Sequence, residues 1–128
     1  MTIKLHEPSY DEEEIQAVVD VLRSKNVTMG EKVREFEDTF ARMFNHKHAV
    51  SCNSGSSANL LAVAAMVALG RLRRGDEVVV SALSWSTTVA PLFQYGLVPV
   101  FVDCDLETLN IDNAAVKQAL SPSVKAIM

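Results

Sequence analysis

The chain has 128 residues, of which 48% are hydrophobic and 22% charged, and its formal net charge is −4. This composition is typical of one globular domain and excludes a disordered or collagen-like chain. An acidic chain also lacks the basic surface expected of a nucleic-acid-binding protein. Residues 1–8 lack the apolar core of a signal peptide, and no apolar run approaches the ~18 residues of a membrane helix. We therefore expect a cytoplasmic protein with no nucleic-acid or membrane partner.

Residues 1–48 are predicted to form an N-terminal helical segment. Ser9, followed three residues later by Glu12, is a capping-box pattern that would start a first helix. Apolar residues then recur at the spacing of one helix face, and the same spacing recurs in a second helix. The first stripe comprises Ile15, Val18, Val19 and Leu22, and the second comprises Val33, Phe36, Phe40 and Phe44.

Residues 49–128 alternate between strand-like and helix-like patterns. Strands are expected at residues 49–52, 77–81, 98–102 and 124–128, and helices at residues 58–69, 86–95 and 112–120. The first of these helices is apolar on nearly every face and is therefore expected to be buried. This order predicts an α/β fold with a parallel sheet. Because the chain stops inside its last strand, we interpret it as truncated, with residues 49–128 forming a partial domain.

Residues 53–57 (Asn-Ser-Gly-Ser-Ser) form the first candidate site, a short turn that leads into a helix. The N–H groups at a helix N-terminus bind anions, glycine permits close approach, and serine hydroxyls can donate hydrogen bonds. The pattern matches neither a Walker A sequence nor a dinucleotide-binding fingerprint. Simple capping of the helix by serine is an equally good interpretation at this point.

Trp85, the only tryptophan, lies among small hydroxyl residues (Ser-Trp-Ser-Thr-Thr, residues 84–88) after the second strand. Its indole could stack on a planar ring whose phosphate the first turn holds. The alternative is a core aromatic side chain beneath the next helix.

Asp103 and Asp105 follow the third strand. Paired carboxylates can serve acid–base chemistry or bind a metal, but such a pair more often caps the following turn. The cysteines and histidines lack the spacing of zinc ligands, so no metal site is expected. No lysine lies in an apolar run at the carboxyl end of a strand, where a reactive amine would be found.

Several of these stretches together resemble the DegT/DnrJ/EryC1/StrS family of nucleotide-sugar aminotransferases, which depend on pyridoxal 5'-phosphate (PLP). They are, in chain order, residues 7–8, 28–37, 53–60, 74–80, 84–88, 96–103 and 108–112. The resemblance covers essentially the whole chain. It implies the N-terminal part of the large domain of fold-type-I PLP-dependent transferases, in an enzyme about three times as long as this chain.

The resemblance also implies a site. Gly55, Ser56 and Ser57 match the positions that hold the cofactor phosphate, and Trp85 matches the aromatic residue that stacks on the pyridine ring. The family's Schiff-base lysine falls beyond residue 128, so no catalytic residue is assigned and this chain alone is expected to be inactive.

The function implied is amino transfer to a nucleotide-linked keto-sugar, with glutamate as amino donor, by a homodimer with active sites at the subunit interface. Such enzymes act in cell-surface polysaccharide or deoxyaminosugar biosynthesis. A sugar 3-dehydratase on the same scaffold, in which histidine replaces the lysine, is the first alternative. A non-catalytic, ligand-binding remnant is the second.

Overall fold

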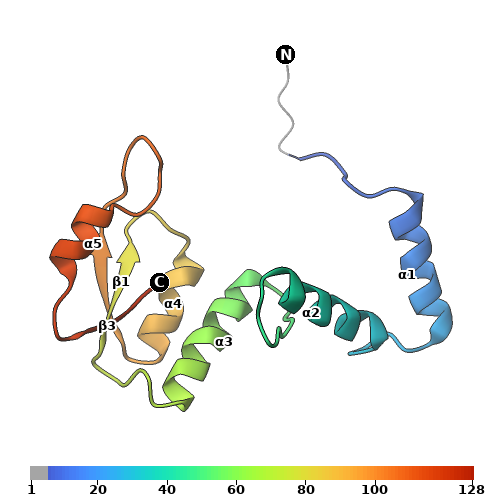
Figure 1. Cartoon of the computed structure of the whole chain (residues 1–128), viewed down its shortest axis with the longest axis horizontal. Coiled ribbons are helices and arrows are strands. Elements are labelled where there is room, and N and C mark those ends of the chain that lie inside the picture. Colours follow the sequence, from blue (N-terminus) through green and yellow to red (C-terminus); the bar gives the residue numbers. More distant parts are fainter. Residues whose placement is uncertain (1–5) are drawn as a thin grey trace. The chain divides into compact units, whose positions relative to one another are not determined.

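The computed structural model describes residues 6–128, so part of the N-terminal stretch that lacks a signal-peptide core lies outside the described residues. The chain divides into two compact units, of which the first ends at Ser51 and the second spans Cys52–Met128. Each is described by itself. The N-terminal unit contains helices α1 and α2, whereas the second contains all of the described strands (Figure 1).

Helix α1 spans Glu12–Ser24 and begins two residues later than a cap at Ser9 predicts. Asp11 is the N-cap: its carboxylate accepts a hydrogen bond from the Glu13 N–H at 2.9 Å, and the Glu14 carboxylate accepts one from the Asp11 N–H at 2.8 Å. The capping box is therefore formed by Asp11 and Glu14. Aspartate caps a helix as well as serine does, and the two patterns overlap in this acidic stretch.

Helix α2 spans Glu31–Met43, and its covered face differs from the predicted one. Phe36, Phe40 and Phe44 lie on one side, as expected, and their rings pack against each other with centroids 5.8 and 4.6 Å apart. These rings are nevertheless largely exposed. The residues that are covered are Val33, Glu37 and Ala41, which follow one another at intervals of four and so form a second stripe.

The second unit contains a three-stranded parallel sheet in the order β2-β1-β3. Its strands are β1 (Glu77–Ser81), β2 (Val98–Val102) and β3 (Val124–Ile127), which confirms three of the four predicted strands. The predicted strand at residues 49–52 is wrong, because this segment joins no sheet. The N–H of Ser51 instead donates to the carboxylate of Glu37.

Strand β1 lies at the centre of the sheet and supplies most of the core. Val78 and Val80 pack on one face with residues of helices α3 (Gly55–Ala68) and α4 (Ser86–Gln94). Val79 points to the other face and packs with Val116 of helix α5 (Asn113–Ala119). The alternation of side chains along a strand thus places helices on both faces of the sheet, which confirms the predicted α/β fold.

Helix α3 is less buried than its apolar sequence predicts. It begins at Gly55, within the predicted turn, and only Val63 is buried. Leu60, Leu61 and Met66 are 38–50% exposed. Because apolar residues cover every side of this helix, one face can enter the core while the others remain open.

We predict that Leu92→Ala destabilises the chain by about 2–5 kcal/mol, because Leu92 of α4 is only 1% exposed within the α3–α4 side of the core. Leu106, which is 87% exposed, is the matched control, and Leu106→Ala should change stability by less than about 0.5 kcal/mol. Urea unfolding followed by circular dichroism measures both. Equal losses in the two variants would contradict this description of the core.

Candidate functional site

The N-terminus of helix α3 presents free hydrogen-bond donors. Ser54 is the N-cap, and its side-chain oxygen accepts from the Ser57 N–H at 3.2 Å. The N–H groups of Gly55 and Ser56 have no acceptor among residues 6–128. Capping therefore explains Ser54 but leaves two donors at the positive end of the helix dipole, where an anion is stabilised.

The serine hydroxyls at this end differ in their contacts. The Ser54 hydroxyl donates to the Ser57 oxygen at 3.2 Å, so the proton of Ser57 is left to donate elsewhere. The Ser56 hydroxyl has no hydrogen-bond partner within the described part of the chain. Both hydroxyls can therefore donate to a bound ligand.

Gly55 occupies a position where the fold itself does not demand glycine. It is not in the left-handed region, and a β-carbon built there would meet no atom within 4 Å. The missing side chain leaves open space next to the two free N–H groups. A ligand could occupy this space, and an anion there would lie directly against the backbone donors.

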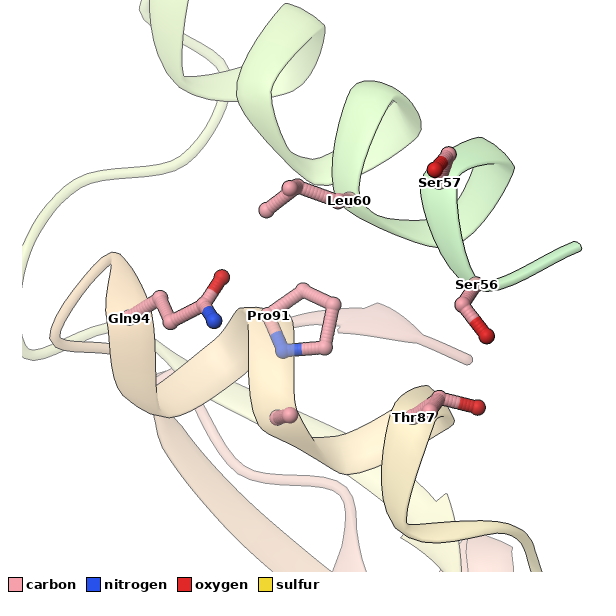
Figure 2. Close-up of a pocket in the computed structure, with 7 residues that line it drawn as sticks. Ser56, Ser57, Leu60, Thr87, Pro91 and Gln94 are labelled. Carbon is pink, nitrogen blue, oxygen red and sulfur yellow. The ribbon is translucent and has the colours of Figure 1, made fainter. Parts of the chain in front are cut away.

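A cleft of about 190 Å³ separates the first turns of α3 from one face of α4. Figure 2 shows the hydroxyls of Ser56 and Thr87 at the same end of this cleft, with Gln94 at the other end. The residues of α4 that line it recur at helical spacing (Thr87, Ala90, Pro91 and Gln94), and α3 contributes Ser56, Ser57 and Leu60. Neither Pro91 nor Gln94 is among the predicted site residues, although their spacing of four and seven residues from Thr87 could have indicated them.

Trp85 is 82% exposed, so the alternative of a core aromatic beneath α4 is wrong for this chain. It occupies the N-cap position of α4, two residues before Thr87, and its carbonyl accepts from the Thr88 N–H at 2.9 Å. Its side chain is not part of the cleft lining. The structure thus brings Ser56 and Ser57 to one cleft, with Gly55 at the adjoining helix start, and leaves the indole of Trp85 open to a ligand.

Asp103 and Asp105 make local turns. The Asp103 carboxylate accepts from the Cys104 N–H at 2.8 Å, and the Asp105 carboxylate accepts from the N–H groups of Glu107 and Thr108 at 3.0 and 2.8 Å. Hydrogen bonds from Thr108, and then that from Glu107, lower the pKa of Asp105 below its ordinary value. These contacts match the turn-capping interpretation.

Among residues 6–128, no group of three or more metal-ligating side chains lies close enough together to hold an ion. No described helix is both long and apolar enough to cross a membrane.

Residues 8–128 match the model of the DegT/DnrJ/EryC1/StrS aminotransferase family, which is PLP-dependent. The chain belongs to this family, and the resemblance seen in the sequence is confirmed. Its fold is that of the N-terminal part of fold-type-I PLP-dependent enzymes.

Among individual relatives, GDP-4-keto-6-deoxy-D-mannose 3-dehydratase of Escherichia coli O55:H7 is 50% identical over 122 residues, which cover 94% of this chain and 31% of that protein. A crystal structure of GDP-4-keto-6-deoxymannose-3-dehydratase with a trapped PLP-glutamate geminal diamine has 48% identity and a TM-score of 0.94, over 98% of this chain and 33% of that one. The aminotransferase from Psychrobacter cryohalolentis has 31% identity and a TM-score of 0.82, over 94% of this chain and 30% of that one. The chain therefore spans no more than 33% of the length of these relatives.

The comparisons favour the alternative over the function first expected. The two sugar 3-dehydratases are 50% and 48% identical to this chain, whereas the aminotransferase from Psychrobacter cryohalolentis is 31% identical.

We predict that Asp105 makes the stability of the chain depend on acid. Its pKa is lower in the folded chain than the ordinary 3.8, so its contribution is complete above the unfolded-state pKa and is lost as the pH falls through the folded-state pKa. Asp105→Asn should therefore flatten the acid side of the stability profile, measured by urea unfolding below about pH 5. A carboxyl carbon of Asp105 that titrates at or above 3.8 in an NMR experiment would contradict this prediction.

Proposed function

We propose that the chain forms the cofactor-binding N-terminal part of a PLP-dependent 3-dehydratase that acts on a nucleotide-linked 4-keto-6-deoxy sugar. The enzyme would be about three times as long as this chain and would work in the cytoplasm as a homodimer. The observation that carries the proposal is the 50% identity, across nearly all of the chain, to a dehydratase of this kind. The catalytic residue would lie outside the present sequence.

The start of α3 fits the phosphate of PLP. The free N–H groups of Gly55 and Ser56 and the hydroxyls of Ser56 and Ser57 can all donate to phosphate oxygens. Hydrogen bonds to an ionised acceptor are stronger than those between neutral groups, and the helix dipole adds to them. In this proposal, these residues bind and orient the cofactor, which supplies an electron sink for bond breaking at the sugar.

Trp85 would hold the flat part of the cofactor. Its indole is exposed at the start of α4, two residues before the cleft residue Thr87. An exposed aromatic ring can stack on a pyridine ring. Such a contact would fix the orientation of the ring while the phosphate anchors the other end.

The second candidate function is amino transfer to a nucleotide-linked keto-sugar, with glutamate as donor. The family match and the 0.82 TM-score to an aminotransferase support it. Both reactions would use the same proposed phosphate-binding residues, Gly55, Ser56 and Ser57, so the residues of this chain would serve either one. The third hypothesis is a non-catalytic remnant that only binds a ligand, and it predicts that neither a 3-deoxy sugar nor an amino sugar is formed.

The reaction is tested by incubating the intact protein with PLP, glutamate and GDP-4-keto-6-deoxymannose and analysing the sugar by mass spectrometry. A dehydratase removes the hydroxyl at carbon 3 of the sugar, whereas an aminotransferase replaces the keto oxygen with an amino group. The proposal predicts the 3-deoxy product. An amino sugar that retains its carbon-3 hydroxyl would instead establish the second candidate.

Cofactor binding gives a separate prediction in the intact protein. Ser56→Ala should weaken PLP binding by about 1 kcal/mol or more, because it removes a charge-assisted hydrogen bond, and Ser57→Ala should do the same. Trp85→Ala should cost about 1 kcal/mol, most of which Trp85→Phe should restore. Fluorescence titration of the apo-protein measures these affinities. Ser9→Ala, at an exposed serine outside the site, is the control, and equal affinities in all the variants would contradict the assignment.

A further inference from the structure

The hydroxyl of Thr87 is not used by the described part of the chain. Thr87 is the second residue of α4, and its side chain is exposed. A threonine inside a helix often donates to the carbonyl oxygen three or four residues earlier, but here those residues precede the helix. The Thr87 hydroxyl has no hydrogen-bond partner among residues 6–128, so it is free to donate to a ligand.

The start of α4 also has backbone donors to offer. Its N-cap, Trp85, makes no side-chain cap hydrogen bond. The N–H groups of Ser86 and Thr87 have no acceptor within the described residues. The positive end of the α4 dipole is therefore open to an anion, as the corresponding end of α3 is.

These two helix starts meet at one cleft. Ser56 is the second residue of α3, as Thr87 is of α4, and both line the cleft. Figure 2 shows their hydroxyls at the end of the cleft opposite Gln94. Val63 of α3 and Leu92 of α4 are buried in the same core cluster, so packing in the core holds the two helices next to each other.

A phosphate group can accept hydrogen bonds from both helices at once. It has three terminal oxygens, each of which accepts more than one hydrogen bond, so the donors of Gly55, Ser56 and Ser57 leave capacity for another. In PLP the phosphate ester is joined to the ring by a single methylene. A cofactor that is held at Ser56 and stacked on Trp85 therefore spans the gap between the two helix starts, where Thr87 lies.

We propose that Thr87 is a further phosphate-binding residue, whose hydroxyl donates from the start of α4 to the cofactor phosphate at the start of α3. This inference rests on the proposed binding of PLP. In this arrangement the phosphate bridges the two helices, and the dipoles of both stabilise its charge. Thr87 then contributes to the preference of the site for a phosphorylated ligand over the same ring without phosphate.

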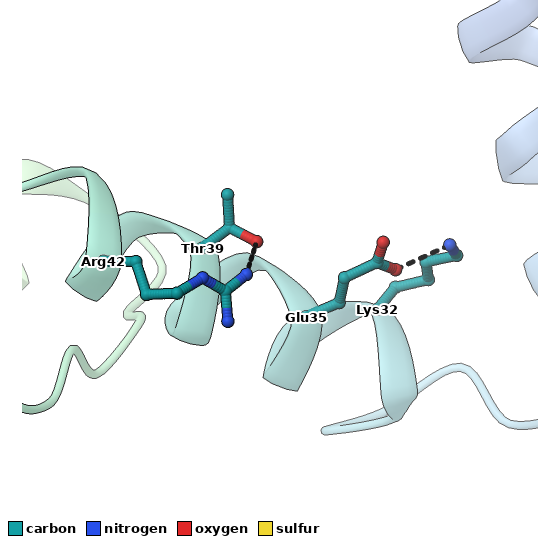
Figure 3. Close-up of polar contacts among 4 residues, drawn as sticks. All are labelled: Lys32, Glu35, Thr39 and Arg42. Carbon is teal, nitrogen blue, oxygen red and sulfur yellow. Dashed lines mark hydrogen bonds and ion pairs between the residues drawn. The ribbon is translucent and has the colours of Figure 1, made fainter.

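Thr39 of α2 provides a matched control. Its hydroxyl accepts from Arg42 at 3.0 Å, and Figure 3 shows this contact on the same helix as the Lys32–Glu35 ion pair. Thr39 lies well inside its helix, where backbone N–H groups bond to carbonyl oxygens and are not free for a ligand. Thr39→Val and Thr87→Val thus make the same substitution at exposed helical positions, but only the second removes a hydroxyl next to free N–H donors.

The test compares PLP with pyridoxal, which has the same ring but no phosphate, in binding titrations of the intact protein. Thr87→Val should weaken PLP binding roughly three- to tenfold and leave pyridoxal binding unchanged, because it removes a hydrogen bond that only the phosphate accepts. Thr87→Ser keeps the hydroxyl and should retain most of the affinity for PLP. Thr39→Val should change neither affinity.

Three results would overturn the inference. They are PLP binding that is unchanged in Thr87→Val, equal losses of PLP and pyridoxal in that variant, and a Thr87→Ser variant that binds PLP as weakly as Thr87→Val. The second of these would mean that Thr87 only supports the structure around Trp85. A wild-type protein that binds PLP no more tightly than pyridoxal would instead overturn the proposed function, and the inference with it.

Discussion

The hydrogen bond between the Ser54 hydroxyl oxygen and the Ser57 N–H determines which backbone donors of the candidate site are free to bind a ligand. The chain itself satisfies the Ser57 N–H, whereas the N–H groups of Gly55 and Ser56 have no acceptor in the described structure. A helix end that is fully capped has little left for a ligand, whereas one without a cap frays. Here one serine caps the helix and the next two remain available.

The sheet places the second half of the site. Strand β1 is buried on both faces, and the chain leaves its carboxyl end through Trp85 into α4. Because α3 and α4 pack on the same face of β1, the hydroxyls of Ser56 and Thr87 meet at one cleft. Helix α4 starts just after the carboxyl end of β1, the end of a parallel strand at which ligands generally bind.

Much of the fold could be predicted from the sequence, since the three strands and the helices between them have clear local patterns. Which helix faces are exposed could not be predicted in this way. Phe36, Phe40 and Phe44 form an apolar stripe that stays exposed, whereas Glu37 lies on the covered stripe because Ser51 binds its carboxylate. That contact joins residues 14 positions apart, so no local pattern contains it. Likewise, the sequence of residues 49–52 reads as a strand, but strand formation depends on a neighbouring strand that this segment does not meet.

The choice between dehydration and amino transfer could not be predicted from the pattern of helices and strands. In the proposed function, Gly55, Ser56 and Ser57 bind the cofactor phosphate in either reaction, so they do not distinguish a dehydratase from an aminotransferase. The proposal of a dehydratase rests on the 50% identity to a 3-dehydratase.

The central claim is that the start of α3 binds the cofactor phosphate. Its most direct test is an NMR titration of the isotope-labelled intact protein with PLP, following the backbone amide signals of Gly55 and Ser56. The account predicts that these two amides show large downfield proton shifts, because their N–H groups gain a charged acceptor. PLP binding that leaves both amide signals unchanged would contradict it.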